Sequence, residues 1–225
     1  MIFAMNNPPA TVDSTSKEKI YRQMRRSIIM GHHRPGERLD IEELAARFET
    51  SVTPVRDALQ MLSQEGLVTI RPRSGYFVAS MTVKQLRDLL DLRKILELSA
   101  VERATQRITP EQISALRSVH AGYTGDDDES YDRYTDENRR FHYYVALASG
   151  NRELAEMIGH LHDRLARFMV LRHAGKSQEA THARIVEALE KHDIDLARQA
   201  LLEDIETSRD AILDGVLDEI AASNI

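Results

Sequence analysis

The chain has 225 residues, of which 42% are hydrophobic and 29% charged, enough apolar material for one large or two modest domains. It contains no cysteine, which excludes disulfides, thiolate metal sites and cysteine nucleophiles. No run of about 18 apolar residues and no signal-peptide pattern occurs, so we expect a cytoplasmic protein with no membrane partner.

The net charge of −6 is unevenly distributed. Residues 1–80 hold 11 Lys and Arg against 9 Asp and Glu, whereas residues 81–225 hold 19 against 27. A slightly basic module joined to an acidic one is the arrangement expected of a DNA-binding domain followed by a sensing domain, although chance could produce it at this size.

The N-terminal region divides into an arm and a helix. Residues 1–15 contain Pro and Asn without an apolar period, and we expect a disordered arm. Between residues 16 and 31, Ile20, Met24 and Ile28 recur at helical spacing, which predicts an amphipathic helix. We expect four basic residues of this helix to face solvent: Lys19, Arg22, Arg25 and Arg26.

Two short helices are predicted next. Asp40 is a candidate N-cap of the first, and polar residues 49–51 interrupt its apolar period. The second begins near Thr53, where Pro54 in the first turn loses no hydrogen bond because that amide would be unpaired anyway.

A hairpin follows these helices. Two β-rich runs, 68–70 and 76–78, flank a turn at residues 71–75 that places two arginines at its tip. Helix, turn, helix and basic wing are the plan of a winged helix-turn-helix domain, which we expect over residues 16–79.

The second helix and the turn carry side chains suited to DNA. Small polar side chains and a cation in the first turns of a recognition helix can reach phosphates or base edges in the major groove, while the wing reaches backbone or minor groove. The candidate DNA contacts are Ser51, Thr53, Pro54, Arg56, Arg71, Arg73, Ser74 and Gly75. The alternative is a protein-interaction module whose hydroxyls only cap the helix.

Beyond the wing the pattern is helical throughout. Thr82 caps the first helix, and breakers such as Thr109-Pro110 and Gly150-Asn151 separate those that follow. The six predicted helices cover residues 83–106, 110–121, 130–148, 152–171, 177–191 and 193–220. We therefore expect residues 83–222 to form an all-α bundle, which makes the whole chain mainly α.

Polar residues interrupt the apolar stripes of this bundle. Asn138 and His142 share the apolar face of the third helix, His182 heads the stripe of the fifth, and Asp204 lies in that of the sixth. Burying such groups is costly unless they pair or bind a ligand. Two imidazoles, an amide and a carboxylate predict a site for a divalent metal ion such as Zn, Ni or Mn, and no organic cofactor is expected.

Each histidine taken alone could instead be a hydrogen-bonded core residue. We expect four other histidines to have no ligand role: His160, His162, His173 and His192.

Arg93 lies on the apolar stripe of the first long helix, with Glu97 one turn later. Guanidinium geometry matches a carboxylate bidentately, which predicts a carboxylate effector near Arg93, Glu97 and Tyr134. The alternative is an ion pair within the helix or at a dimer interface.

The motifs of residues 35–78 resemble the N-terminal domain of the GntR family of bacterial transcription regulators. The matching elements are Pro35-Gly36, Leu39, Ser51, Thr53-Pro54-Val55-Arg56, Ala58-Leu59, Glu65-Gly66-Leu67 and Gly75-Tyr76-Phe77-Val78. The resemblance implies binding of double-stranded operator DNA, a first helix packed behind the recognition helix, and phosphate contacts from Arg34 or Arg38. Glu42 and Val52 depart from the commoner pattern, which leaves the operator sequence open.

The second domain resembles the FCD ligand-binding domain in its six-helix, VanR-type form. Asn138 and His142, the Ser-Gly-Asn turn at 149–151 and His182 match the family pattern, whereas Asp204 stands where the family has a third histidine. That exchange replaces an imidazole nitrogen with a harder carboxylate oxygen and lowers the affinity of the site for zinc or nickel. The resemblance implies a homodimer whose effector is a small organic acid, often in contact with the metal.

We therefore predict a homodimeric transcription regulator, most such regulators being repressors, and not an enzyme. Two alternatives use the same His and Asp residues: a metal-dependent enzyme, which lacks an evident general base beside the ligands, and a metal sensor without an organic ligand. The identity of the effector, the operator and the sign of regulation cannot be read from the sequence.

Overall fold

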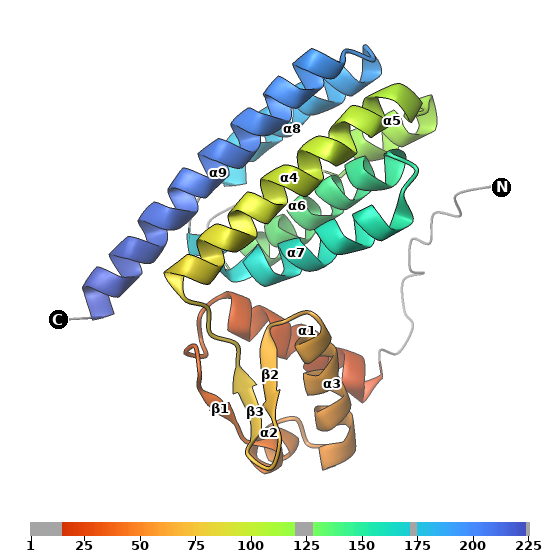
Figure 1. The fold of residues 1–225 in the computed structure, drawn as a ribbon. Helices are drawn as coiled ribbons and strands as arrows, with labels where there is room; N and C mark the ends of the chain where they lie inside the picture. Colours follow the sequence, from red (N-terminus) through yellow and green to blue (C-terminus); the bar gives the residue numbers. More distant parts are fainter. Residues whose placement is uncertain (1–14, 120–127, 172–174, 224–225) are drawn as a thin grey trace.

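The computed structural model describes residues 15–119, 128–171 and 175–223 (Figure 1). A small head that contains the only described sheet lies below a domain of long helices in this view. The arm expected over residues 1–15 falls outside the described residues except for Thr15, as do His173 and most of the predicted acidic loop after residue 121.

The head is built on three helices. Their bounds are Ser16–Ile29 for α1, Ile41–Arg47 for α2 and Val52–Gln64 for α3. A capping box between Thr15 and Glu18 starts α1, and the Asp40 carboxylate accepts from the first amides of α2. Apolar faces of α1 and α3 share one core, so α1 packs behind the recognition helix as the resemblance implied.

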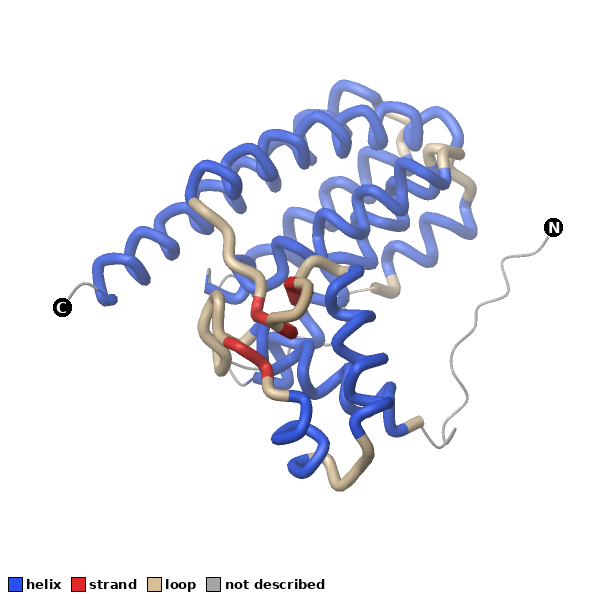
Figure 2. The backbone as a smooth tube through the Cα atoms, turned by 60° about the horizontal axis from the view of Figure 1, so that its bottom comes forward, coloured by secondary structure: helices blue, strands red, loops and turns tan. Residues whose placement is uncertain are grey.

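The predicted hairpin is present, and the structure adds a third strand. The strands, red in Figure 2, are β1 Arg38–Leu39, β2 Val68–Arg71 and β3 Gly75–Val78. They are antiparallel in the order β1-β3-β2 (Figure 1). Arg71 pairs with Gly75, so residues 72–74 form the wing tip, where Arg73 adopts a left-handed φ of 61°. The strand β1 was not predicted; it is two residues long and is formed by pairing with β3.

The six predicted helices of the second domain are confirmed. Their bounds are α4 Val83–Arg107, α5 Pro110–Arg117, α6 Asp128–Ala148, α7 Arg152–Leu171, α8 Gly175–Glu190 and α9 Ile194–Ser223. Thr82 and Thr109 form capping boxes as expected, and Gly150 takes a left-handed φ of 78° between α6 and α7. Helix α4 packs against α6, α7 and α9 on one side and keeps its other face exposed (Figure 1).

The head and the helical domain are joined by Arg25, which is only 7% exposed. The expectation that this residue faces solvent is therefore wrong. Its Nε lies 3.3 Å from Glu65 at the end of α3, while Nη1 lies 2.9 Å from Asp136 of α6 and Nη2 3.6 Å from Asp163 of α7. Burial alone would lower the pKa of Arg25, but the carboxylates around it raise it.

Replacing Arg25 should destabilise the whole chain. Arg25→Met removes the cation paired with Glu65 and leaves Asp163 with Arg139 alone, so we expect the free energy of unfolding to fall by about 3 kcal/mol. Urea denaturation followed by circular dichroism measures it. Arg22→Met, on the exposed face of the same helix, is the matched control and should stay within about 0.5 kcal/mol of wild type; equal losses in both variants would contradict the structural role of Arg25.

Candidate functional site

The first turn of α3 presents free polar groups at the surface of the head. Ser51 is the N-cap residue, yet its side chain makes no capping hydrogen bond. Thr53 and Arg56 are exposed and Pro54 is half-buried. The Ser51 hydroxyl is therefore available to a ligand, which argues against the alternative that it only caps the helix.

The wing adds further cations beside this helix. Arg71, Arg73 and Ser74 are exposed, and the Arg71 guanidinium lies 4.2 Å from the centre of the Phe77 ring, a cation–π contact that orients it. Gly75, at the base of the turn, has a φ of 106°. A glycine is favoured here because residues with a Cβ atom rarely adopt a positive φ.

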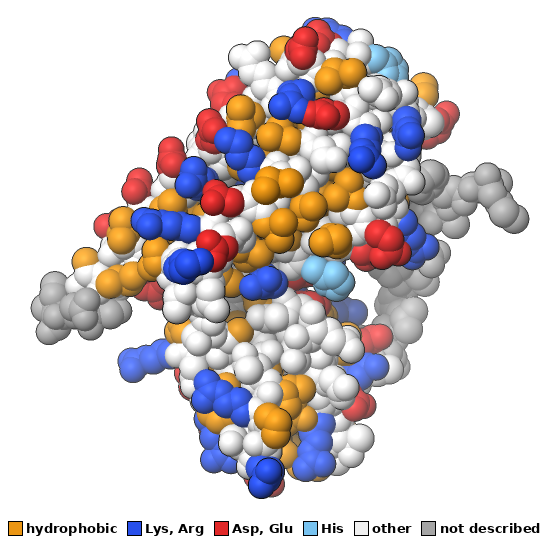
Figure 3. All heavy atoms as spheres, in the orientation of Figure 1, with side chains coloured by type: hydrophobic (Ala, Val, Ile, Leu, Met, Phe, Trp, Pro, Cys, Tyr) orange, Lys and Arg blue, Asp and Glu red, His pale blue; other side chains and the backbone are white. Residues whose placement is uncertain are grey.

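Two more exposed arginines of the head lie on the strand β1 and in the loop before it. Arg38 lies on β1 opposite Phe77, and Arg34 is exposed in the preceding loop. Figure 3 shows blue Lys and Arg side chains gathered over the lower end of the head. This end is the basic surface expected of a module that binds phosphates.

A second candidate site lies inside the helical domain, where five helices bury a polar centre. We define this centre by seven side chains, none more than 3% exposed: Arg93 and Glu97 of α4, Asn138 and His142 of α6, His162 of α7, His182 of α8 and Asp204 of α9. The structure thus brings together all four expected metal ligands with Arg93 and Glu97. Tyr134 is also buried and interacts electrostatically with Arg93.

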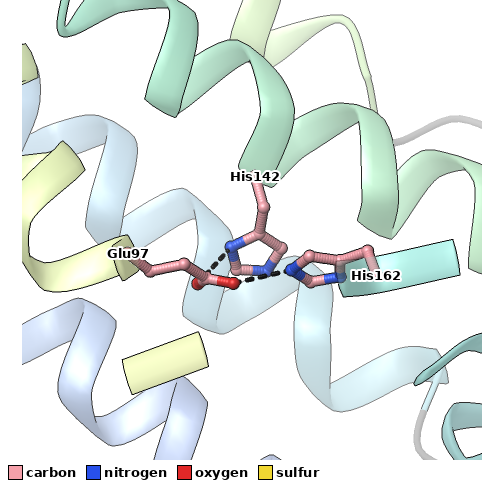
Figure 4. A group of neighbouring side chains, drawn as sticks. All are labelled: Glu97, His142 and His162. Carbon is pink, nitrogen blue, oxygen red and sulfur yellow. Dashed lines mark hydrogen bonds and ion pairs between the residues drawn. The ribbon is translucent and has the colours of Figure 1, made fainter. Parts of the chain in front are cut away.

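Glu97 is clamped between two imidazoles (Figure 4). His142 Nδ1 lies 2.9 Å from Oε2, and His162 Nε2 lies 2.6 Å from Oε1. A carboxylate only accepts, so both of these nitrogens carry the proton. The opposite nitrogens, His142 Nε2 and His162 Nδ1, are then acceptors, and the Asn138 amide donates to the latter at 3.2 Å.

Arg93 closes the other side of the centre. Its Nε donates to Glu97 Oε1 at 2.9 Å, and its Nη2 donates to Asp204 Oδ2 at 3.2 Å and lies 3.3 Å from His142 Nε2. Asp204 also accepts from the Thr181 hydroxyl at 2.9 Å. Every charge in the centre is therefore paired across helices.

Burial and neighbouring charges shift two pKa values here. Burial would raise the pKa of Glu97, but Arg93, His142 and His162 hold it well below the ordinary value. Burial, with the charge of His142, lowers the pKa of His162 from 6.5 to about 3. Glu97 is thus ionised and His162 neutral near pH 7.

Several buried polar atoms have no hydrogen-bond partner among the residues described. Those of the buried centre include Arg93 Nη1, a donor, and Asn138 Oδ1, an acceptor. An unpaired buried polar atom is costly and is a common mark of a place where a ligand or water binds.

His162, for which no ligand role is expected from the sequence, lies within the buried centre. A signal was available: His162 lies four residues after Ile158 and four before Ala166, both buried, so it interrupts an apolar stripe as His142 does. Its partner Glu97 is 65 residues away, however, and that pairing cannot be read from spacing.

The donor types suit a divalent metal, but protonated nitrogens oppose it in one group of donors and Arg93 opposes it in the other. Two groups of three donors lie close together, Glu97 with His142 and His162, and His142 with His182 and Asp204. In the first group both facing nitrogens carry protons. In the second, the single lone pair of His142 Nε2 already faces Arg93 Nη2. A metal ion does not fit this arrangement unless Arg93 leaves.

Two cavities lie away from this centre, at the junction of the domains. The larger, about 560 Å³, is lined by residues that include Leu67, Val78 and Phe168; the smaller, about 390 Å³, surrounds Arg25. Neither contains a residue of the buried centre.

Comparison with known proteins identifies both modules. Residues 16–78 match the bacterial regulatory proteins of the gntR family, and residues 88–207 match the FCD domain. The chain belongs to the GntR family. The Nta operon transcriptional regulator of Aminobacter aminovorans is 33% identical over 202 residues, which cover 86% of this chain and 94% of that relative.

Other relatives agree with this assignment. The transcriptional repressor RspR of Escherichia coli is 27% identical over 87% of this chain and 88% of its own length. The solved structure of E. coli McbR/YncC superposes with a TM-score of 0.70 at 22% identity, covering 89% of this chain and 98% of that one, and so shares the fold.

This GntR protein is a DNA-binding transcription regulator and not an enzyme, as the sequence predicted. The alternative of a metal-dependent enzyme is therefore rejected. Across residues 15–119, 128–171 and 175–223, no helix is both long and apolar enough to cross a membrane.

Sequence preference should depend on Arg56. Arg56→Ala removes a cation from the first turns of α3, so we expect the preference for operator over random DNA to fall by about 1–3 kcal/mol. Fluorescence anisotropy with both DNAs at several salt concentrations measures it. Arg87→Ala, exposed on α4, is the control and should keep the wild-type ratio; an unchanged ratio in Arg56→Ala would remove this residue from the interface.

Acid stability should depend on His162. The pKa of His162 is about 6.5 in the unfolded chain and about 3 in the folded protein. Between these pH values the unfolded chain binds the proton and the folded protein does not, so this histidine makes the folded state less stable as the pH falls. The melting temperature of His162→Gln should therefore fall less than that of wild type between about pH 7.5 and about pH 5. His160→Gln, exposed on the same helix, should follow wild type, and parallel curves for all three proteins would contradict the prediction.

Proposed function

We propose that this GntR regulator is a homodimer whose operator binding is controlled by a small carboxylate bound in the buried centre. The observation that carries the proposal is Arg93, fully buried, with Nη1 lacking a hydrogen-bond partner in the described part of the chain. A carboxylate oxygen is the acceptor that a guanidinium N–H binds best.

The second unpaired atom narrows the class of ligand. Asn138 Oδ1 needs a donor, and a hydroxyl or amino group beside the carboxylate would supply it. We therefore favour a small hydroxy or amino acid, with Arg93, Glu97 and Tyr134 on one side and Asn138 on the other.

The route from this centre to the DNA runs along α6 and α7. On α6, Asn138 of the centre lies two residues after Asp136, which binds Arg25. On α7, His162 of the centre is followed directly by Asp163, which also contacts Arg25. A ligand that enters the packed centre moves these helices. The movement changes the contacts of Asp136 and Asp163 with Arg25 of α1, and through Arg25 it affects Glu65 at the end of α3.

An apolar surface supports the proposed homodimer. Among the exposed large hydrophobic residues, Leu92 and Ile95 lie on α4 and Met157 on α7, and Ile95 is 66% exposed. Figure 3 shows hydrophobic side chains gathered across the middle of the helical domain. A second copy covering this surface would place two heads on a two-fold related operator.

The direction of control is proposed from the relatives. RspR is named a repressor, and we propose that this chain also represses and releases DNA when the ligand binds. The alternative of a metal sensor, in which a metal ion alone binds Asn138, His142, His182 and Asp204, stays a prediction from sequence. The contact between Arg93 and the lone pair of His142 argues against this alternative. A cytoplasmic location likewise stays a prediction.

The test is a screen of small carboxylates against the operator complex. The operator is first selected by the full chain from random-sequence DNA, and we expect two-fold symmetry in it. One hydroxy or amino acid should then weaken operator binding at least tenfold, a coupling of about 1.4 kcal/mol, in wild type and in Arg87→Gln.

Variants of the centre complete the test. Arg93→Gln should bind the operator without responding to the acid, and Tyr134→Phe should respond at higher acid concentration. No response to any carboxylate, or an equal response in Arg93→Gln, would contradict the proposal.

A further inference from the structure

Arg93 stands where the buried centre needs a cation. Its guanidinium contacts both carboxylates, Glu97 through Nε and Asp204 through Nη2, and faces the acceptor nitrogen of His142. We propose that Arg93 is the permanent cation of this centre and takes the place of a divalent metal ion, so the centre takes its carboxylate ligand without a metal. The ligand rests on the proposed function, whereas the exclusion of metal rests on these contacts alone.

The lone pairs of His142 and His162 are already directed at partners. A divalent ion needs unprotonated nitrogen donors. His142 directs its protonated nitrogen at Glu97 and its lone pair at Arg93, and His162 directs its protonated nitrogen at Glu97 and its lone pair at Asn138. A metal held by His142, His182 and Asp204 would have to displace Arg93 from His142 Nε2 and from Asp204. A metal held by Glu97, His142 and His162 would also require both histidines to change tautomer.

Arg93 also supplies positive charge to the centre. Its guanidinium, which never loses its proton, lies against the carboxylates of both Glu97 and Asp204. Removing Arg93 would leave Glu97 and Asp204 buried without a counter-charge, which is the state that attracts a cation. One side chain therefore decides whether this centre holds metal.

Metal retention tests this directly. Untagged full-length protein is treated with a chelator, incubated with Zn²⁺, Ni²⁺ or Mn²⁺, desalted and analysed for bound metal. Wild type and the surface control Arg87→Gln should retain less than about 0.1 ion per chain, whereas Arg93→Gln should retain about one. Arg93→Gln with Glu97→Gln keeps the net charge of the centre unchanged and serves if the single variant does not fold.

Each outcome decides the question. Wild-type protein that retains about one ion per chain, lost in His142→Ala with His182→Ala, would overturn the proposal. So would variants that fold yet retain no more metal than wild type, because Arg93 would then not be what excludes the ion. Failure of chelated wild type to respond to any carboxylate would count against the proposed function and leave the metal result standing.

Discussion

The helical domain is organised around one constraint, which is that a charge buried in protein must be paired. Arg93 and Glu97 lie one turn apart on the face of α4 that packs against α6, α7 and α9, and both are almost wholly inaccessible to water. Each therefore has to find its partners on the surrounding helices. Glu97 takes its partners from α6 and α7, and Arg93 takes Asp204 from α9. The relative positions of four helices depend on these few contacts.

The same constraint recurs at the junction with the head. Arg25 is nearly buried and must be paired, and its partners come from α3, α6 and α7. The two clusters thus share α6 and α7, and within each helix their residues are two positions apart or adjacent. Buried ion pairs have few alternative arrangements, so these two clusters fix how α6 and α7 lie against the rest of the chain.

Much of the fold could be predicted because its signals are local. The Asp40 cap, Pro54 in the first turn of α3 and the hairpin turn each act within a few residues, and all lie where expected. The strand β1 was missed because two residues carry no period and the strand exists only through β3.

The centre was predicted only in part, for a related reason. Polar residues on apolar stripes revealed Asn138, His142, His182 and Arg93, but not which of them pair. Arg93 meets Asp204 across 111 residues, and Arg25 meets Asp136 across the same separation. Such partners are set by helix packing, which periodicity does not encode. The predicted metal set therefore named neighbouring residues without showing that Arg93 lies among them.

The central claim is that the buried centre and the DNA-binding head are energetically coupled through α6 and α7. A double-mutant cycle on operator binding tests it most directly, using His142→Gln in the centre, Arg25→Lys at the junction, and both together. These residues share no contact, so independent effects would add to within about 0.3–0.5 kcal/mol. We predict a coupling energy above about 1 kcal/mol; additive effects would contradict the account.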